Sequence, residues 1–311
     1  MPTRPPRSPQ RRVTARRAGA AVAGAGTAAV FYGSVIERNA FVLRRRDVPV
    51  LSPGSAPLRV LHLSDLHITA GQRRKQQWIR SLAALEPDLV VNTGDTLSAV
   101  NAMPAVLYAL EPLAEFPAVF VPGNNDYYAP RPKNPLRYFQ APGDLPTGLT
   151  RLPWGEMAAS LVDAGWTDLT HVRTVLAAGA DGAAKVALAG TDDPHLRKAR
   201  YELIAGAAEP GAAVRIGVTH SPEPTVLGAF AGDGYDLVLA GHTHGGQVRL
   251  PGIGAVVTNC GIDRARARWL HRWDEHMYFH VSAGLGTNPF SPIRFCCRPE
   301  ATLLTLTPRE G

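Results

Sequence analysis

The stretch LRVLHLSDLH, residues 58–67, runs from an apolar segment into an aspartate and a histidine. Its first part has the length and the Val/Leu content of a β-strand. In an extended chain, side chains two positions apart point to the same side, so Asp65 and His67 can face one centre. A single D-x-H pair is more often a turn or a cap than a metal site. Its meaning therefore depends on which residues stand at the ends of the other apolar runs.

Similar apolar runs recur along the rest of the chain. They lie at residues 88–93, 118–123, 185–190, 214–220, 236–241 and 277–284. Helical patterns at residues 73–87 and 102–116 separate the early runs. Strands that alternate with helices of this length predict an α/β layered fold.

Residues with metal-ligand chemistry come after nearly every run. These are Asp95 in TGD, Asn124, Asn125 and Asp126 in GNND, His220 in TH, and His242 and His244 in GHTH. Sites in open α/β sheets form outside the carboxyl ends of the strands. A set of carboxylate, imidazole and amide groups without thiolate favours Mn, Fe or Zn over a soft metal. The pattern predicts a metal centre, and one carboxylate placed between two ions is the usual dinuclear arrangement.

As a set, these motifs resemble the calcineurin-like metallophosphoesterase family. The resemblance covers roughly residues 58–284 and rests on Asp65-x-His67, Gly94-Asp95, Gly123-Asn124-x-Asp126, His220 and Gly241-His242-x-His244. The flanking segments GTDDPH (190–195) and GLGTNPFSPIRF (284–295) resemble the membrane-associated bacterial branch of that family. The resemblance implies a metallo-dependent phosphatase-like fold: a four-layer α/β sandwich of two mixed β-sheets flanked by helices.

The resemblance also implies roles for individual residues. One divalent ion would be held by Asp65, His67 and His244, a second by Asn124, His220 and His242, and Asp95 would bridge them. The family carries a histidine where this chain has Asn125. We therefore expect Asn125 and Asp126 to be catalytic residues, with Asp126 orienting residue 125 or a water, in a site that lacks the usual imidazole. His195 and Arg294 are candidates for contacting phosphate, with a helix cap and a surface charge as the respective alternatives.

The N-terminal region differs from the rest of the chain. Residues 1–17 hold six of the arginines and no acid, so they account for six of the net charge of +7. Residues 1–17 are therefore a basic arm. The rest of the chain carries a net charge of only +1, which predicts no nucleic-acid-binding face. Residues 18–36 carry no charge, and a helix of this length is about enough to cross ~30 Å of hydrocarbon. We expect a membrane anchor, a signal-like segment or a membrane-lying helix there, with a buried helix as the alternative.

The remaining organisation is read from composition. Residues 37–57 are predicted to be a linker, and residues 58–311 the main domain. Within it, residues 127–153 form an irregular insertion with six prolines, of the kind that serves as a lid, a binding loop or a plain surface excursion. Its aromatic side chains are expected either to line an apolar substrate wall or to pack among themselves: Tyr127, Tyr128, Tyr138, Phe139 and the adjacent Trp154. Cys260, Cys296 and Cys297 match neither a disulfide framework nor a zinc pattern.

These expectations define a leading hypothesis and its rivals. The leading one is a dinuclear metal-dependent phosphoesterase at the bacterial cell membrane. Its substrate would be a phosphodiester or pyrophosphate, of a lipid-linked or UDP-sugar type. The alternatives are a soluble cyclic-nucleotide-type phosphodiesterase and a catalytically weakened metal-binding envelope protein. The substrate, the native metal, the side of the membrane and the oligomeric state stay open at this stage.

Overall fold

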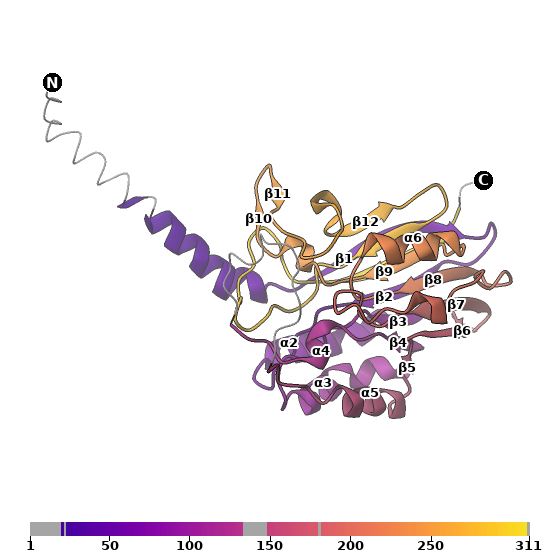
Figure 1. Ribbon diagram of the computed structural model, residues 1–311, viewed down its shortest axis with the longest axis horizontal. Helices are drawn as coiled ribbons and strands as arrows, with labels where there is room; N and C mark the ends of the chain where they lie inside the picture. Colours follow the sequence, from indigo (N-terminus) through magenta and orange to yellow (C-terminus); the bar gives the residue numbers. More distant parts are fainter. Residues whose placement is uncertain (1–19, 22, 133–147, 180–181, 310–311) are drawn as a thin grey trace, which may run out of the picture.

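The computed structural model describes residues 20–21, 23–132, 148–179 and 182–309. Two six-stranded sheets form its centre (Figure 1). The first sheet contains, in order, β1 (Val42–Leu51), β14 (Glu300–Pro308), β2 (Leu58–Leu63), β3 (Leu89–Asn92), β4 (Ala118–Phe120) and β5 (Thr167–Asp168). The second contains β12 (Trp269–Arg272), β13 (Tyr278–Val281), β9 (Leu237–Ala240), β8 (Val214–Val218), β7 (Ala184–Gly190) and β6 (Val172–Ala178). Both sheets mix parallel and antiparallel pairs, as expected.

Helices cover the outer faces of the two sheets (Figure 1). The first sheet is covered by α2 (Arg73–Ser81), α3 (Met103–Leu110) and α5 (Trp154–Asp163), and the second by α6 (Pro224–Gly232). The four-layer α/β sandwich expected from the sequence is therefore confirmed. Shorter elements complete it: η1 (Tyr32–Ile36), η2 (Glu37–Asn39), η3 (Leu82–Leu85), η4 (Glu111–Glu115), α4 (Asn124–Tyr127), η6 (Tyr201–Leu203), η7 (His244–Gly246), β10 (Arg249–Leu250), β11 (Gly254–Ala255) and η8 (Arg264–Arg266).

The central core lies between the two sheets. Val60, Val91 and Val119 of the first sheet share one buried cluster with Ile216 and Leu239 of the second. The central strands have both faces covered, and for this reason they read as continuous apolar runs rather than alternating ones. Because the core holds the two sheets together, it also fixes the loops at their carboxyl ends against each other.

The region expected to be a linker contains a strand instead. β1 pairs in parallel with β14, and its Val48, Val50 and Leu51 are buried against the inter-sheet core. The prediction of a linker over residues 37–57 was therefore wrong for Val42–Leu51. The arginines at 44–46 made the segment look solvated, whereas an edge strand can expose such side chains and still bury its other residues.

Residues 20–21 and 23–31 are helical and lead into η1. This helix extends away from the sandwich in Figure 1, and its apolar side chains, among them Val30 and Phe31, are exposed. Within the described ranges, no helix combines the length and the apolar character needed to cross a bilayer. The basic arm at 1–17 and, in the insertion, Tyr138 and Phe139 lie outside the described residues.

Candidate metal centre

The predicted ligands meet where the carboxyl ends of five strands converge. The loops after β2, β3 and β4 bring Asp65, Asp95 and Asn124 from the first sheet. The loops after β8 and β9 bring His220 and His242 from the second sheet. The site is thus built across the sandwich, with each sheet contributing part of it.

Four of the predicted ligands form a compact cluster. One ligand atom from each of Asp65, His67, Asp95 and His244 lies within 4.8 Å of all the others. His67 Nε2 is 3.5 Å from Asp95 Oδ2, and His244 Nε2 is 3.5 Å from Asp65 Oδ1. The two Nε2 atoms lie 3.3 Å apart. Two imidazoles and two carboxylates that converge on one point form a donor set that suits a divalent transition ion.

The other predicted ligands adjoin this cluster through Asp95. His220 Nε2 lies 3.5 Å from Asp95 Oδ1, the oxygen not used toward His67. His242 Nδ1 is 3.2 Å from His220 Nε2. Asn124 Oδ1 is buried without a hydrogen-bond partner among the described residues. Buried polar atoms nearly always have a partner, so an orphaned amide oxygen in the loop that adjoins Asp95 fits the coordination of a cation.

Outer hydrogen bonds orient the imidazoles. His220 Nδ1 lies 2.7 Å from the carbonyl oxygen of Thr93, His244 Nδ1 3.2 Å from that of Gly286, and His242 Nε2 3.2 Å from that of Asn259. A carbonyl oxygen only accepts, so each of these nitrogens carries the proton and donates it. The opposite nitrogen of each ring is thereby directed toward the centre, where its lone pair would be available to a bound cation once any proton on it has left. This is the usual support of metal-binding histidines.

The backbone at the site is strained. Positive φ angles occur at Asp65 (48°), His67 (43°), Asp95 (54°), His242 (68°) and His244 (49°). Left-handed conformations of non-glycine residues are uncommon and cost of order 1–3 kcal/mol each, and they cluster at functional sites. Their concentration on the predicted ligands supports a functional site here.

Two glycines permit the close packing of the loops. A Cβ atom at Gly123 would lie 2.3 Å from Asp95 Oδ1 and 2.7 Å from His220 Cε1. At Gly241 it would lie 1.7 Å from Ser64 Oγ and 2.6 Å from Asp65 Oδ2. Any side chain at either position would displace the carboxylates from the centre.

The electrostatics of the site also favour a bound cation. Burial raises the pKa of Asp95 to about 7, against the opposing effect of His220. For His220, burial lowers the pKa, but the nearby carboxylates of Asp95, Asp193 and Asp65 outweigh it and raise the pKa to about 9. Burial lowers the pKa of His244 to about 4. Buried carboxylates that lack enough positive charge are a good setting for divalent ions.

Asn125 and Asp126 have different surroundings. The Asn125 side-chain amide donates to Asp95 Oδ2 at 2.6 Å, and its backbone N–H donates to Asp95 Oδ1 at 2.7 Å. Asp126 was expected to orient residue 125 or a water. It is instead fully buried and accepts hydrogen bonds from the backbone N–H groups of Thr96, Leu97 and Gly123. Asp126 therefore positions the two ligand-bearing loops rather than contacting substrate.

The two residues predicted to contact phosphate also have different surroundings. The ring of His195 lies 4.4 Å from that of His242, centroid to centroid, at the edge of the centre. Arg294, by contrast, is 0% exposed, and its guanidinium donates to the backbone carbonyls of Ala283, Gly284, Gly286 and Cys297. A phosphate contact by Arg294 is thus excluded by burial. Its role is to hold the loop that packs against Asp65 and His67.

Three supporting residues were not expected from the sequence. Ser98 Oγ lies 3.0 Å from His67 Nδ1. Ser64 donates to Asp65 Oδ2 at 2.6 Å. The buried Lys75 amine donates to the carbonyl oxygen of Leu66 at 2.7 Å. Ser64 adjoins a motif, but Ser98 in a loop and Lys75 on α2 take these positions through tertiary packing and have no local sequence signal.

Comparison with known proteins matches residues 58–246 to the family model described as calcineurin-like phosphoesterase. Phosphodiesterase YaeI of Escherichia coli K12 is 27% identical over 278 residues, which cover 86% of this chain and 88% of that protein. A transmembrane protein with metallophosphoesterase domain from Danio rerio is 28% identical over 277 residues, or 80% of this chain and 53% of its own length. Among solved structures, TT1561 of Thermus thermophilus aligns with a TM-score of 0.41 and 13% identity, over 74% of this chain and 91% of its own.

Proposed function

Because the chain belongs to the calcineurin-like phosphoesterase family and is a metal-dependent phosphoester hydrolase, we propose that it hydrolyses phosphodiester or pyrophosphate bonds with two divalent ions that share Asp95. The observation that carries this proposal is the position of Asp95 between two sets of ligands. Its Oδ2 faces His67 and its Oδ1 faces His220, each at 3.5 Å. When bound, two such ions would acidify a water molecule and polarise the phosphoryl oxygens.

The residues divide between the two ions by their contacts. Asp65, His67 and His244 belong to the compact cluster, and they would hold one ion. The other would be held by His220, which faces the second carboxylate oxygen of Asp95, together with His242 and Asn124. The absence of thiolate and the presence of imidazole suit Mn, Fe or Zn.

Asn125 bears on the choice of substrate. An asparagine donates a hydrogen bond but cannot deliver a proton to a departing alkoxide. A departing phosphate or aryl oxide needs little such help. We therefore propose a preference for pyrophosphate-linked or activated esters, such as a lipid-linked or UDP-sugar-type substrate, over alkyl phosphodiesters. A proton delivered by His195, beside His242, would remove that preference.

The surface next to the N-terminal helix supports membrane association. Phe31 and Val35 are 59% and 51% exposed, and Ile253, at the tip of the β10–β11 hairpin, is 69% exposed. The two regions are connected through one segment: Tyr32 contacts the ring of Phe295, whose carbonyl oxygen accepts from the hairpin at Arg249. Exposed apolar side chains that follow an arginine-rich segment such as residues 1–17 are typical of chains that lie in a membrane interface.

One experiment tests the catalytic proposal. Purified full-length protein is loaded with manganese, assayed with bis(p-nitrophenyl) phosphate, and analysed for bound metal. We expect turnover together with two ions per chain. One ion per chain in fully active protein would overturn the dinuclear arrangement, and absence of turnover in protein with both ions would favour a metal-binding envelope protein.

A second experiment tests the membrane proposal. We expect the full chain to sediment with vesicles that contain anionic phospholipid, and the Phe31→Ser/Ile253→Ser double variant to sediment less. Val175→Ser is the matched control, because Val175 is 45% exposed on β6, away from the helix. Equal sedimentation of the double variant and the control would contradict the proposal.

A further inference from the structure

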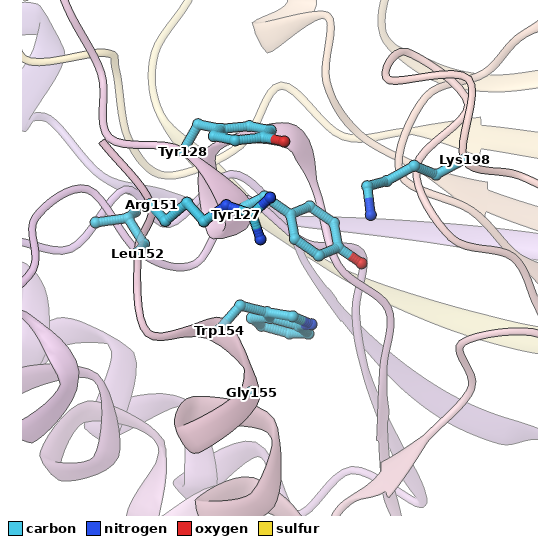
Figure 2. A pocket seen from close by; sticks show the side chains of 7 residues that line it. All are labelled: Tyr127, Tyr128, Arg151, Leu152, Trp154, Gly155 and Lys198. Atoms are coloured by element: carbon cyan, nitrogen blue, oxygen red, sulfur yellow. The ribbon is translucent and has the colours of Figure 1, made fainter. Parts of the chain in front are cut away.

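A cavity of about 270 Å³ lies beside α4, outside the ligand cluster (Figure 2). This size is close to the lower end of small-molecule sites and suits one compact group rather than a long chain. It is lined by three aromatic rings, two cationic side chains and little else: Tyr127, Tyr128, Arg151, Leu152, Trp154, Gly155 and Lys198.

The cavity and the metal centre share two chain segments. At one end of α4, Asn125 donates to Asp95, while Tyr127 at the other end lines the cavity. Asp192 accepts from the Tyr127 hydroxyl at 2.9 Å, and three residues further on His195 lies against His242. A molecule that reacts at the metal centre therefore has the cavity next to it.

The charges in the cavity are unequally compensated. The Lys198 ammonium lies 3.9 Å from a carboxylate oxygen of Asp192 and 4.0 Å from the centroid of the Tyr127 ring. Arg151 is exposed, and no acidic side chain of the described residues lies within 4 Å of its guanidinium. Arg151 is thus the cation available to an incoming anion, whereas Asp192 largely offsets Lys198.

The aromatic rings indicate a second property of a ligand for this cavity, a planar group. Tyr127 is 6.4 Å from Tyr128 and 6.2 Å from Trp154, centroid to centroid, and Figure 2 shows the three rings with the Arg151 side chain among them. Planar, π-faced groups stack on such rings, and a guanidinium binds phosphate through paired N–H donors.

We propose that this cavity binds a nucleoside phosphate: the base lies against the aromatic rings and a phosphate lies on Arg151. The inference rests on the proposed function, since it assigns the cavity to the part of the substrate that is joined to the scissile phosphoryl group. It thereby names the substrate class as a nucleotide-containing phosphoester.

The test measures binding without hydrolysis. Full-length protein is treated with a chelator, so that phosphate cannot bind through metal, and is titrated calorimetrically with AMP, adenosine and ribose 5-phosphate. We expect AMP to bind at least about tenfold more tightly than ribose 5-phosphate, because only AMP offers a ring for stacking. Adenosine, which lacks the phosphate, should be about tenfold weaker than AMP. Equal binding of AMP and ribose 5-phosphate would overturn the assignment.

Variants locate the binding in the cavity. Arg151→Gln should weaken AMP about tenfold through loss of charge-assisted hydrogen bonds. Arg74→Gln is the matched control, because Arg74 is an exposed arginine on α2. Tyr128→Leu should weaken AMP about fivefold or more, whereas Tyr128→Phe, which keeps the ring, should bind like the wild type. Equal effects of the two arginine variants would refute the proposal.

The outcomes separate this inference from the proposed function. AMP binding that depends on Arg151, in a protein that hydrolyses no phosphoester when metal-loaded, would uphold the cavity and reject the hydrolase assignment. Hydrolysis of bis(p-nitrophenyl) phosphate together with no AMP binding would uphold the hydrolase and reject the cavity.

Discussion

Two groups of buried histidines lie close together in this chain, and they differ in the charged groups that surround their rings. One is the candidate metal centre, where His220 faces Asp95 and His242 contacts His220. The other is the His62–His280 pair between the two sheets, in which the Nδ1 atoms lie 2.9 Å apart and His62 Nε2 lies 3.1 Å from Thr93 Oγ1. Both members of the pair are 0% exposed. Burial alone therefore does not distinguish a ligand from a core histidine.

The difference lies in the groups that surround the rings. In the His62–His280 pair, burial first and then the positive charges of His271 and Arg46 lower the pKa of His280 to about 3. At the metal centre, carboxylates raise the pKa of His220 despite equal burial. Imidazole lone pairs that converge with carboxylates and an orphaned amide oxygen indicate an ion site. Imidazoles that mainly contact each other indicate packing.

The largest loss of activity is expected for Asp95→Asn. The variant removes the charge proposed to hold both ions, which forfeits several kcal/mol of transition-state stabilisation, or roughly 10³-fold in kcat/KM. Metal content, measured by elemental analysis, should fall in parallel. Asp163→Asn, which changes an exposed carboxylate on α5, is the control and should behave like the wild type. Full activity with both ions retained in Asp95→Asn would contradict the assignment of the shared ligand.

The next largest effect is expected at Asn125. Asn125→His restores an imidazole beside Asp95 and can supply a proton to the leaving oxygen, so cleavage of alkyl phosphodiesters should rise by up to about 10²-fold. Aryl and pyrophosphate substrates should change little, because their leaving groups need less protonation. Parallel steady-state kinetics with an alkyl and an aryl diester measure the selectivity. An equal change for both substrates would reject this account of Asn125.

A smaller loss is expected when the support of the loops is altered. In Asp126→Asn, the side-chain NH₂ faces backbone N–H groups whose hydrogen bonds the carboxylate accepted. Loss of a supporting partner of this kind lowers metal affinity or activity by about 10–100-fold. Burial raises the pKa of Asp126 to about 6, although the backbone hydrogen bonds to its carboxylate act in the opposite direction. Metal titration should show weaker binding without a change in metal stoichiometry. Loss of all activity with unchanged metal affinity would instead indicate that Asp126 has a direct catalytic role.

The residues that gather at the candidate metal centre were predictable because two local signals coincide. A short apolar run ends, and a carboxylate, imidazole or amide comes within a few residues, often after a glycine such as Gly94 or Gly241. The sheet then brings the ends of its strands together. Helices α2 and α3 and the central strands were predictable for a related reason, since the helices carry a periodic apolar pattern and the strands short continuous apolar runs.

The features that the sequence did not predict depend on long-range packing. β1 lies at the edge of a sheet and pairs with β14, nearly the whole chain away, so its charged residues were taken for a linker. Arg294 was assigned to phosphate, because its local sequence does not show that four carbonyl oxygens surround its guanidinium. The His62–His280 pair joins two strands of different sheets, and the sequence of neither strand indicates that the two histidines are in contact.

The smallest predicted effect is a pH-dependent change in the free energy of unfolding that comes from the His62–His280 pair. In the folded protein His280 has a pKa of about 3, against 6.5 for an unperturbed histidine. The unfolded chain therefore binds more protons as the pH falls through the unperturbed value, and the free energy of unfolding decreases. Between about pH 7.5 and about pH 6, His280 should account for a loss of about 1 kcal/mol.

His280→Gln should remove this contribution and leave the activity of metal-loaded protein nearly unchanged, because the side chain lies between the sheets and touches no predicted ligand. Urea unfolding of chelated protein at the two pH values measures the difference, and the chelator prevents metal binding from adding its own pH dependence. His276→Gln, which replaces an exposed histidine near the start of β13, serves as the control. A flatter pH dependence in His280→Gln alone, with activity retained, would place this pair in the packing of the core. A loss of metal affinity in that variant would show instead that the His62–His280 pair acts on the metal centre through Thr93, whose hydroxyl contacts His62 and whose carbonyl oxygen accepts from His220.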